Sequence, residues 1–152
     1  MKRLLLAVVL LCGCDTKTTN SQKGDSMLSP QDVNALILDR LSQPDFKEID
    51  GVLYFGKGAD RGGTRMFVST MTRDEVVAAL NAVIEPHVTE LAWGDDYGQY
   101  HGAFTVKGTS DQVFGLGVSS LKAKTDTFRN APDILRDYET DIVYTPPATV
   151  KP

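Results

Sequence analysis

The chain has 152 residues and a mass of 16.6 kDa, which is enough for one domain of ordinary globular composition and excludes a rod or a disulfide-rich miniprotein. Twenty acidic residues against 16 basic residues give a net charge of -4 and a pI near 5.1. This acidic balance argues against a nucleic-acid partner, because such a partner requires a basic surface that displaces counterions from phosphates.

The first residues have the pattern of an export signal. Lys2 and Arg3 precede an apolar run from Leu4 to Leu11. The run is far shorter than the roughly 20 residues that a helix needs to cross a bilayer, so a lone transmembrane helix is not expected. A charged start, a short apolar run and a small-residue site are typical of a signal that directs export.

The apolar run ends in Leu11-Cys12-Gly13-Cys14, which resembles the lipobox of bacterial lipoproteins. The resemblance implies that residues 1–13 are a signal peptide and that Cys14 carries a diacylglycerol thioether and an acylated amine. It covers only this N-terminal stretch and implies nothing about the domain that follows. An ordinary secretory signal with two incidental cysteines is the alternative.

The residue after the lipobox bears on the membrane that holds the protein. In enterobacterial lipoproteins, an aspartate at the position of Asp15 is associated with sorting to the inner membrane, and the resemblance therefore favours the inner over the outer membrane. The alternative is that Asp15 is merely a polar residue at the start of a tether. From Asp15 to Ser26 there is no large apolar residue, so we expect residues 14–28 to be the lipidated cysteine and a flexible tether.

Only two cysteines are present, Cys12 and Cys14, and both belong to the signal. The mature domain therefore holds no disulfide, and its stability must come from its core. Loss of Lys2 and Arg3 with the signal makes the mature chain more acidic. Anionic headgroups repel such a chain, so we expect the lipid to anchor it on the periplasmic side of the membrane.

Two helices have clear start signals. Ser29 is a capping residue before Pro30, with the acidic Asp32 three residues after the cap. Thr72 and Glu75 form a capping box at the second start. Apolar residues then follow at helical spacing, and Pro86 ends the second helix. The expected buried faces are Val33, Leu36, Ile37 and Leu41 in the first helix, and Val76, Val77, Leu80, Val83 and Ile84 in the second.

Each helix precedes two expected strands joined by a polar turn. Strands at 52–55 and 65–69 are expected after the first helix. The glycine-rich segment 56–63 between them lacks the ending of a phosphate loop, so we interpret it as a hairpin connection. Strands at 89–93 and 103–106 follow the second helix. We therefore predict an α+β fold, a small antiparallel sheet with helices on one face, and the recurrence of helix and hairpin suggests two repeats.

The C-terminal third is ambiguous. Residues 113–118 fit a strand weakened by two glycines, and they also fit a helix capped by Ser110; the cost of glycine in a helix favours the strand. A helix start is expected at 130–133, with Ile134, Leu135 and Tyr138 turned inward. Residues 141–144 are expected to close the sheet as an edge strand. The globular domain thus spans 29–145, followed by a Pro-rich tail at 146–152.

The expected loop 94–102 gathers polar and aromatic residues, which makes it the candidate partner-binding site: Asp95, Asp96, Tyr97, Tyr100 and His101. Tyrosines and aspartates on a loop can anchor a protein interface. A divalent metal is the alternative, but adjacent carboxylates on extended backbone point to opposite sides, so no metal is expected. An exposed acidic hairpin tip without a function is the remaining interpretation.

No catalytic residue can be named. The Ser119-x-x-Lys122 spacing lacks the partner motifs of penicillin-interacting enzymes, and His87 reads as a turn residue beside Pro86. No nucleophile elbow and no zinc-binding histidine pair are present, and no cofactor is implied.

Two functions are compatible with these features. The first is a membrane-anchored envelope lipoprotein that binds or scaffolds a protein partner without catalysis. The second is a periplasmic immunity or inhibitor protein whose acidic hairpin enters the cleft of a secreted toxin or hydrolase. The identity of the captured protein, or a neighbouring gene that encodes a toxin, would discriminate between them.

Overall fold

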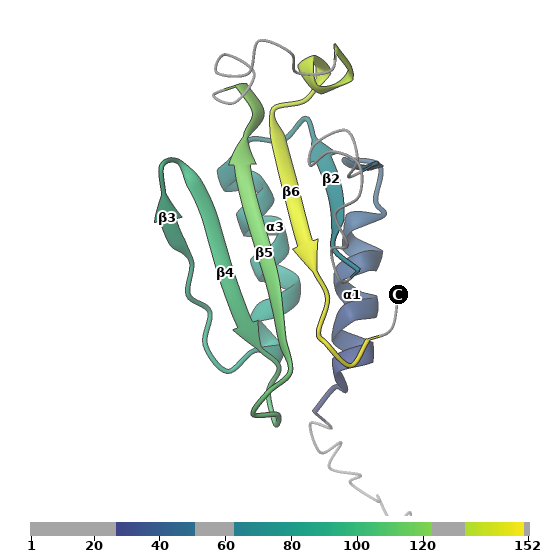
Figure 1. The fold of residues 1–152 in the computed structure, drawn as a ribbon, viewed down its shortest axis with the longest axis vertical. Helices are drawn as coiled ribbons and strands as arrows, with labels where there is room; N and C mark the ends of the chain where they lie inside the picture. The colour runs from purple at the N-terminus through teal and green to yellow at the C-terminus, as the bar shows by residue number, and fades with distance from the viewer. Residues whose placement is uncertain (1–26, 51–62, 123–132, 151–152) are drawn as a thin grey trace, which may run out of the picture.

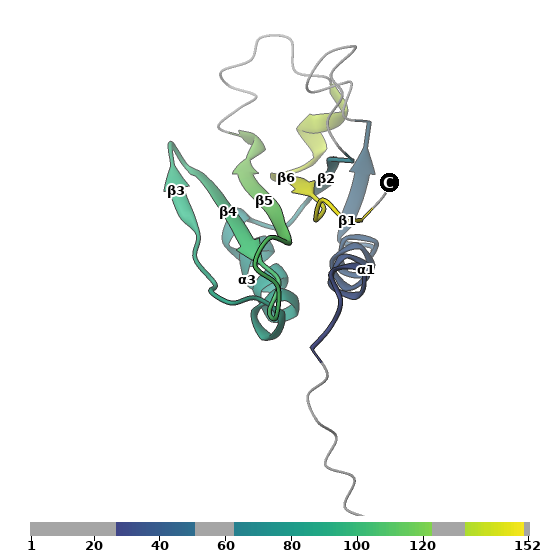
Figure 2. The same ribbon diagram turned by 60° about the horizontal axis from the view of Figure 1, so that its bottom comes forward.

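The computed structural model describes residues 27–50, 63–122 and 133–150. They form a six-stranded antiparallel sheet in the order β1-β2-β6-β5-β4-β3, with α1 and α3 packed on one face (Figures 1 and 2). The predicted α+β class is confirmed. The elements in chain order are α1 Pro30–Leu41, β1 Phe46–Ile49, β2 Arg65–Ser69, α3 Arg73–Ile84, η1 Glu85–His87, β3 Gly94–Asp96, β4 Gln99–Thr105, β5 Val113–Ser120, η2 Asp133–Asp137 and β6 Thr140–Thr145.

Both helices begin where their capping residues predict. The Ser29 hydroxyl accepts the backbone N–H of Asp32 at 3.2 Å, and the Asp32 carboxylate accepts the Ser29 N–H at 3.1 Å. Thr72 and Glu75 make the same reciprocal pair at the start of α3. These hydrogen bonds lower the pKa of the Asp32 and Glu75 carboxyls, since they stabilise the charged forms.

The helices bury the faces that the sequence indicates, with one exception. Leu36, which was expected in the core, is 38% exposed. The stripe of α1 that meets the sheet and α3 is narrower than the predicted face, because only residues one turn apart point at it. The buried residues are Val33, Ile37 and Leu41 of α1, and Val76, Leu80 and Ile84 of α3.

The predicted strand at 65–69 is confirmed as β2, but its partner is β1 at 46–49, directly after α1. The strand expected at 52–55 and the turn at 56–62 lie outside the described residues. The two-repeat expectation is not confirmed, because one strand of the first expected hairpin is not described and one strand of the second is misplaced.

The strand expected at 89–93 is wrong, since β3 comprises only Gly94–Asp96. The segment before it touches the sheet through an isolated bridge between Val88 and Val106. The Trp93 indole N–H donates to Asn81 of α3 at 2.8 Å, and its ring meets Phe104 edge-on with centroids 5.1 Å apart. Thr89, at the start of this segment, donates its N–H to the carbonyl of Thr105 in β4 at 3.0 Å, whereas Leu91 and Trp93 pack against the core.

The strand interpretation of 113–118 is confirmed by β5. The strand expected at 141–144 is present, but the prediction that it lies at the edge of the sheet is wrong. As β6, it lies between β2 and β5 and is buried on both faces, with Asp141, Ile142 and Tyr144 fully covered. The Tyr144 hydroxyl donates to Asn34 of α1 at 2.7 Å, and burial raises the pKa of this phenol.

The larger core lies between the sheet and both helices, and it includes an aromatic row of Phe104, Phe114 and Tyr144. A smaller apolar cluster lies on the opposite sheet face, beneath η2: Ile49, Met66, Val68, Leu121 and Leu135, with Tyr138 against it. The expected helix at 130–133 begins outside the described residues; η2 supplies the buried Leu135, and Tyr138 follows it and packs against the same cluster. Of the tail, Pro147 is buried and the Thr149 hydroxyl donates to Gln112 at 2.5 Å.

Candidate partner-binding hairpin

β3 and β4 form a hairpin whose turn has two residues, Tyr97 and Gly98. Both have positive φ, 49° and 78°, as a type I′ turn requires. This conformation costs glycine little, but the side chain of an L-residue raises its energy by roughly 1–2 kcal/mol. Asparagine or aspartate usually precedes glycine in such turns, so a tyrosine here is unusual.

The Tyr97 side chain is fully exposed, with a relative accessibility of 105%. It is therefore an aromatic ring at the tip of a hairpin that buries none of its surface on folding. The left-handed backbone conformation raises the energy of the folded state, and within the described residues the exposed ring makes no buried contact that would compensate for it. The position accordingly favours a role outside folding.

The structure separates the five candidate residues instead of gathering them. Asp95 pairs with Tyr100 on the face covered by the helices, whereas Asp96 and His101 lie on the opposite face. The expectation that the adjacent carboxylates point to opposite sides is confirmed. Asp95 and Asp96 belong to β3 rather than to a loop, so the exposed loop is only the Tyr97-Gly98 turn.

Arg73, which the sequence analysis did not identify, fixes this hairpin to α3. Its guanidinium carbon lies 3.9 Å from the centroid of the Tyr100 ring, and Nη1 donates to the carbonyl of Gly98 at 2.8 Å. The first residue of α3 thus holds both the turn and an aromatic ring of β4. No local signal reveals this contact, because Arg73 and Gly98 are 25 residues apart.

The hairpin tip and the first turn of α3 together form an acidic end of the molecule. Arg73 is the only basic residue among 72–75 and 94–98, and its guanidinium pairs with Asp74 at 3.4 Å in addition to its contacts with Tyr100 and Gly98. Four carboxylates lie in the same two segments and are exposed: Asp74, Glu75, Asp95 and Asp96.

A serine, a histidine and an aspartate share the sheet face opposite the helices, but they do not form a catalytic arrangement. Ser119 of β5 pairs with Asp141 of β6 and is 3% exposed, and within the described residues its hydroxyl has no hydrogen-bond partner. His101 instead covers Gly94 of β3, where an added Cβ would lie 2.7 Å from Nε2. The imidazole therefore lies on the β3 side, away from Ser119.

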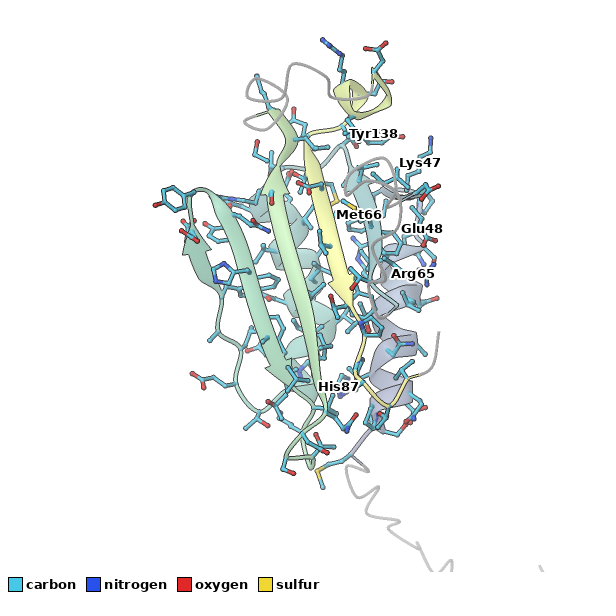
Figure 3. All side chains as sticks on the ribbon, viewed as in Figure 1. Lys47, Glu48, Arg65, Met66, His87 and Tyr138 are labelled. Carbon is cyan, nitrogen blue, oxygen red and sulfur yellow. The ribbon has the colours of Figure 1, made fainter. Side chains whose placement is uncertain are left out.

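The remaining candidates lie elsewhere. His87 is in η1 at the opposite end of the sheet from Tyr138 (Figure 3), and its carbonyl accepts the N–H of Lys107 at 2.9 Å, which fits the expected turn residue. In the described ranges, no group of three or more histidine, cysteine, aspartate or glutamate side chains is placed to hold a metal ion. Cys14 and Asp15 lie outside those ranges.

Comparisons with other proteins add no family: no protein-family model, no curated protein and no solved structure matches this chain. Neither helix of the part that the structure describes combines the length and apolar character needed to span a bilayer.

Proposed function

We propose that this protein is a noncatalytic lipoprotein of the bacterial envelope, anchored through Cys14 and facing the periplasm, that binds a protein partner through its β3–β4 hairpin. The observation that carries the binding role is Tyr97, a fully exposed aromatic residue in a left-handed conformation. The anchor rests on the lipobox resemblance of Leu11-Cys12-Gly13-Cys14.

Tyr97 has the properties of an interface anchor. Tyrosine is enriched at positions where single residues dominate binding, because it offers a large contact area, a hydroxyl group and few rotatable bonds. Arg73 holds the turn through Gly98, so the tip loses less conformational entropy when a partner binds it. The hairpin is therefore prepared for binding before a partner arrives.

The noncatalytic part of the proposal is supported by the sheet face that carries Ser119. General-base activation of a serine needs an imidazole within hydrogen-bonding reach. His101 covers Gly94 instead, and Ser119 is buried beside its neighbours on β5 and β6.

A crosslinked pull-down from native membranes tests the function. Full-length protein is compared with the Tyr97→Ala and Cys14→Ser variants, and bound proteins are identified by mass spectrometry. We expect one stoichiometric envelope protein with the unaltered chain, and its loss with Tyr97→Ala at unchanged protein level. Equal recovery of every protein by all three chains would contradict a specific partner, and recovery of a secreted toxin or hydrolase would replace scaffolding by immunity.

A further inference from the structure

The β3–β4 tip and the entry of the chain into the domain lie at opposite ends of the sheet. Met27, the first described residue, contacts the β4–β5 connection, since a Cβ at Gly108 would lie 2.7 Å from its sulfur. α1 begins three residues later at this lower end, whereas the β3–β4 turn is at the upper end (Figure 1). Residues 99–106, at about 3.3 Å each, separate the two turns by roughly 25 Å.

The contacts of α3 agree with this placement. Its first residue, Arg73, bonds to Gly98 at the tip, and the chain just beyond its end forms the bridge between Val88 and Val106 at the other end of β4. α3 therefore runs beside the sheet from the hairpin tip toward the end where Met27 lies.

Twelve residues separate Cys14 from Met27, so a lipid on Cys14 holds the Met27 end of the domain within about 45 Å of the bilayer. We propose that the Tyr97 tip, which lies at the end of the domain opposite Met27 and the lipidated tether, inserts into a pocket lined by arginine or lysine on a protein partner. This inference rests on the proposed function and adds which end of the domain meets the partner and the chemistry of that partner.

The charge of the tip selects this occupant over a lipid surface. The exposed carboxylates of Asp95 and Asp96 directly precede Tyr97 in the hairpin, while Asp74 pairs with the Arg73 guanidinium, which also contacts Tyr100 and Gly98. Anionic headgroups repel such a surface. A basic pocket offers ion pairs to the carboxylates and a cation to the face of the Tyr97 ring, so it is complementary to the tip.

Site-specific photocrosslinking tests which end of the domain meets the partner. A photoreactive phenylalanine analogue replaces Tyr97 in one variant of the full lipidated chain and Ser110, exposed in the β4–β5 connection, in a matched variant. We expect the partner recovered in the pull-down to crosslink from position 97 and not from position 110. Crosslinking from 110 alone, or from neither position while the pull-down still recovers the partner, overturns the inference together with the hairpin as the binding site of the proposed function.

Charge removal tests the chemistry of the partner. Asp95→Asn with Asp96→Asn is compared with Glu90→Gln with Asp111→Asn, which removes the same charge from exposed positions outside the tip. We expect the tip variant to associate with the recovered partner at least tenfold more slowly in low salt, with little change in the control. Equal association rates for the two variants would overturn the basic pocket.

A third measurement separates a protein partner from a membrane. The chain that begins at Asp15, without signal or lipid, is mixed with vesicles of phosphatidylethanolamine and phosphatidylglycerol. We expect no binding in sedimentation. Binding that Tyr97→Ala abolishes would overturn the inference and make the tip a membrane-inserting element.

Discussion

At the scale of single residues, Tyr97 and its neighbour Gly98 show how one turn serves two requirements. Gly98, with φ of 78°, adopts the left-handed region without steric cost, while Tyr97 adopts it against the preference of its side chain. An exposed residue that raises the energy of the fold is consistent with selection for binding rather than for stability.

Replacing Tyr97 with asparagine is expected to stabilise the isolated domain by about 1 kcal/mol, because Asn-Gly is a preferred type I′ pair and no buried contact is lost. Chemical denaturation of the mature domain measures the change. The same variant should lose partner capture, so stability and binding move in opposite directions. A less stable Tyr97→Asn domain would show instead that the ring supports the fold.

Gly102 is required for a different reason, since the ring of Phe104 lies directly over it. A Cβ at this position would lie only 2.2 Å from a carbon of the Phe104 ring, so Gly102→Ala must displace an aromatic residue of the core. We expect a loss of about 1–3 kcal/mol, as for other overpacked cores. Gly115→Ala is the matched control, because its Cβ would meet Thr145 at an ordinary 3.5 Å; equal losses in thermal denaturation would refute the steric explanation.

At the scale of elements, contacts between α3 and the β3–β4 hairpin determine how rigid the tip is. Arg73 combines a cation–π contact with Tyr100 and a hydrogen bond to Gly98. Its partner within α3 is the exposed Asp74, at 3.4 Å, so removal of the guanidinium should leave the helix intact while it loosens the turn.

We expect Arg73→Met to increase amide hydrogen exchange at 95–98 and to weaken partner capture several-fold, with a change in Tm of only a few degrees. Hydrogen exchange followed by mass spectrometry measures the increase at 95–98. Arg136→Met is the control, since Arg136 is 67% exposed and its ion pair among the described residues is with Asp133 of η2. Unchanged exchange at the tip would show that β3 and β4 alone hold the turn.

The connection between α1 and β1 has an acid-sensitive ion pair. Arg40 donates to both carboxylate oxygens of Asp45 at 3.0 and 2.7 Å, and these hydrogen bonds lower the pKa of that carboxyl. The unfolded chain has the higher pKa, so the contribution is present above about pH 4 and is lost as pH falls through the lower pKa of the folded state.

Asp45→Asn should therefore flatten the acid limb of the stability curve below about pH 4. At neutral pH we expect a cost under about 1 kcal/mol, because both side chains are partly exposed and solvent screens them. Urea denaturation at a series of pH values provides the test. If the variant and the unaltered chain lose the same stability below about pH 4, other carboxyls are responsible for that loss.

At the scale of the whole molecule, the anchor and the fold are expected to be independent. Cys14 lies 13 positions before Met27, the first described residue, and the domain has a core of its own between the sheet and the helices. Cys14→Ser should thus release the chain from the membrane fraction, or leave it with an uncleaved signal, without a change in the Tm of the domain. Full retention in membranes by a processed Cys14→Ser chain would contradict the lipobox interpretation.

The parts of the fold that local chemistry specifies could be predicted. Ser29 and Thr72 mark the helix starts, and their hydroxyls bond to backbone within three residues. The runs of β2 and β5 are apolar and β-branched enough to indicate strands, and the two glycines of β5 argue against a helix. These signals lie within a few neighbouring residues, so no knowledge of the partner strands is needed.

The candidate site was predicted in composition but not in geometry. The sequence by itself determined the class of fold, the helix starts, the signal resemblance and the segment where Tyr97 lies. Only the tertiary structure decided that β6 is central, that β3 begins at Gly94, that Arg73 supports the turn, and that the tip lies opposite Met27. The reason is physical: strand order and these contacts join residues far apart in sequence, and their energies come from packing across the whole sheet rather than from local backbone preference.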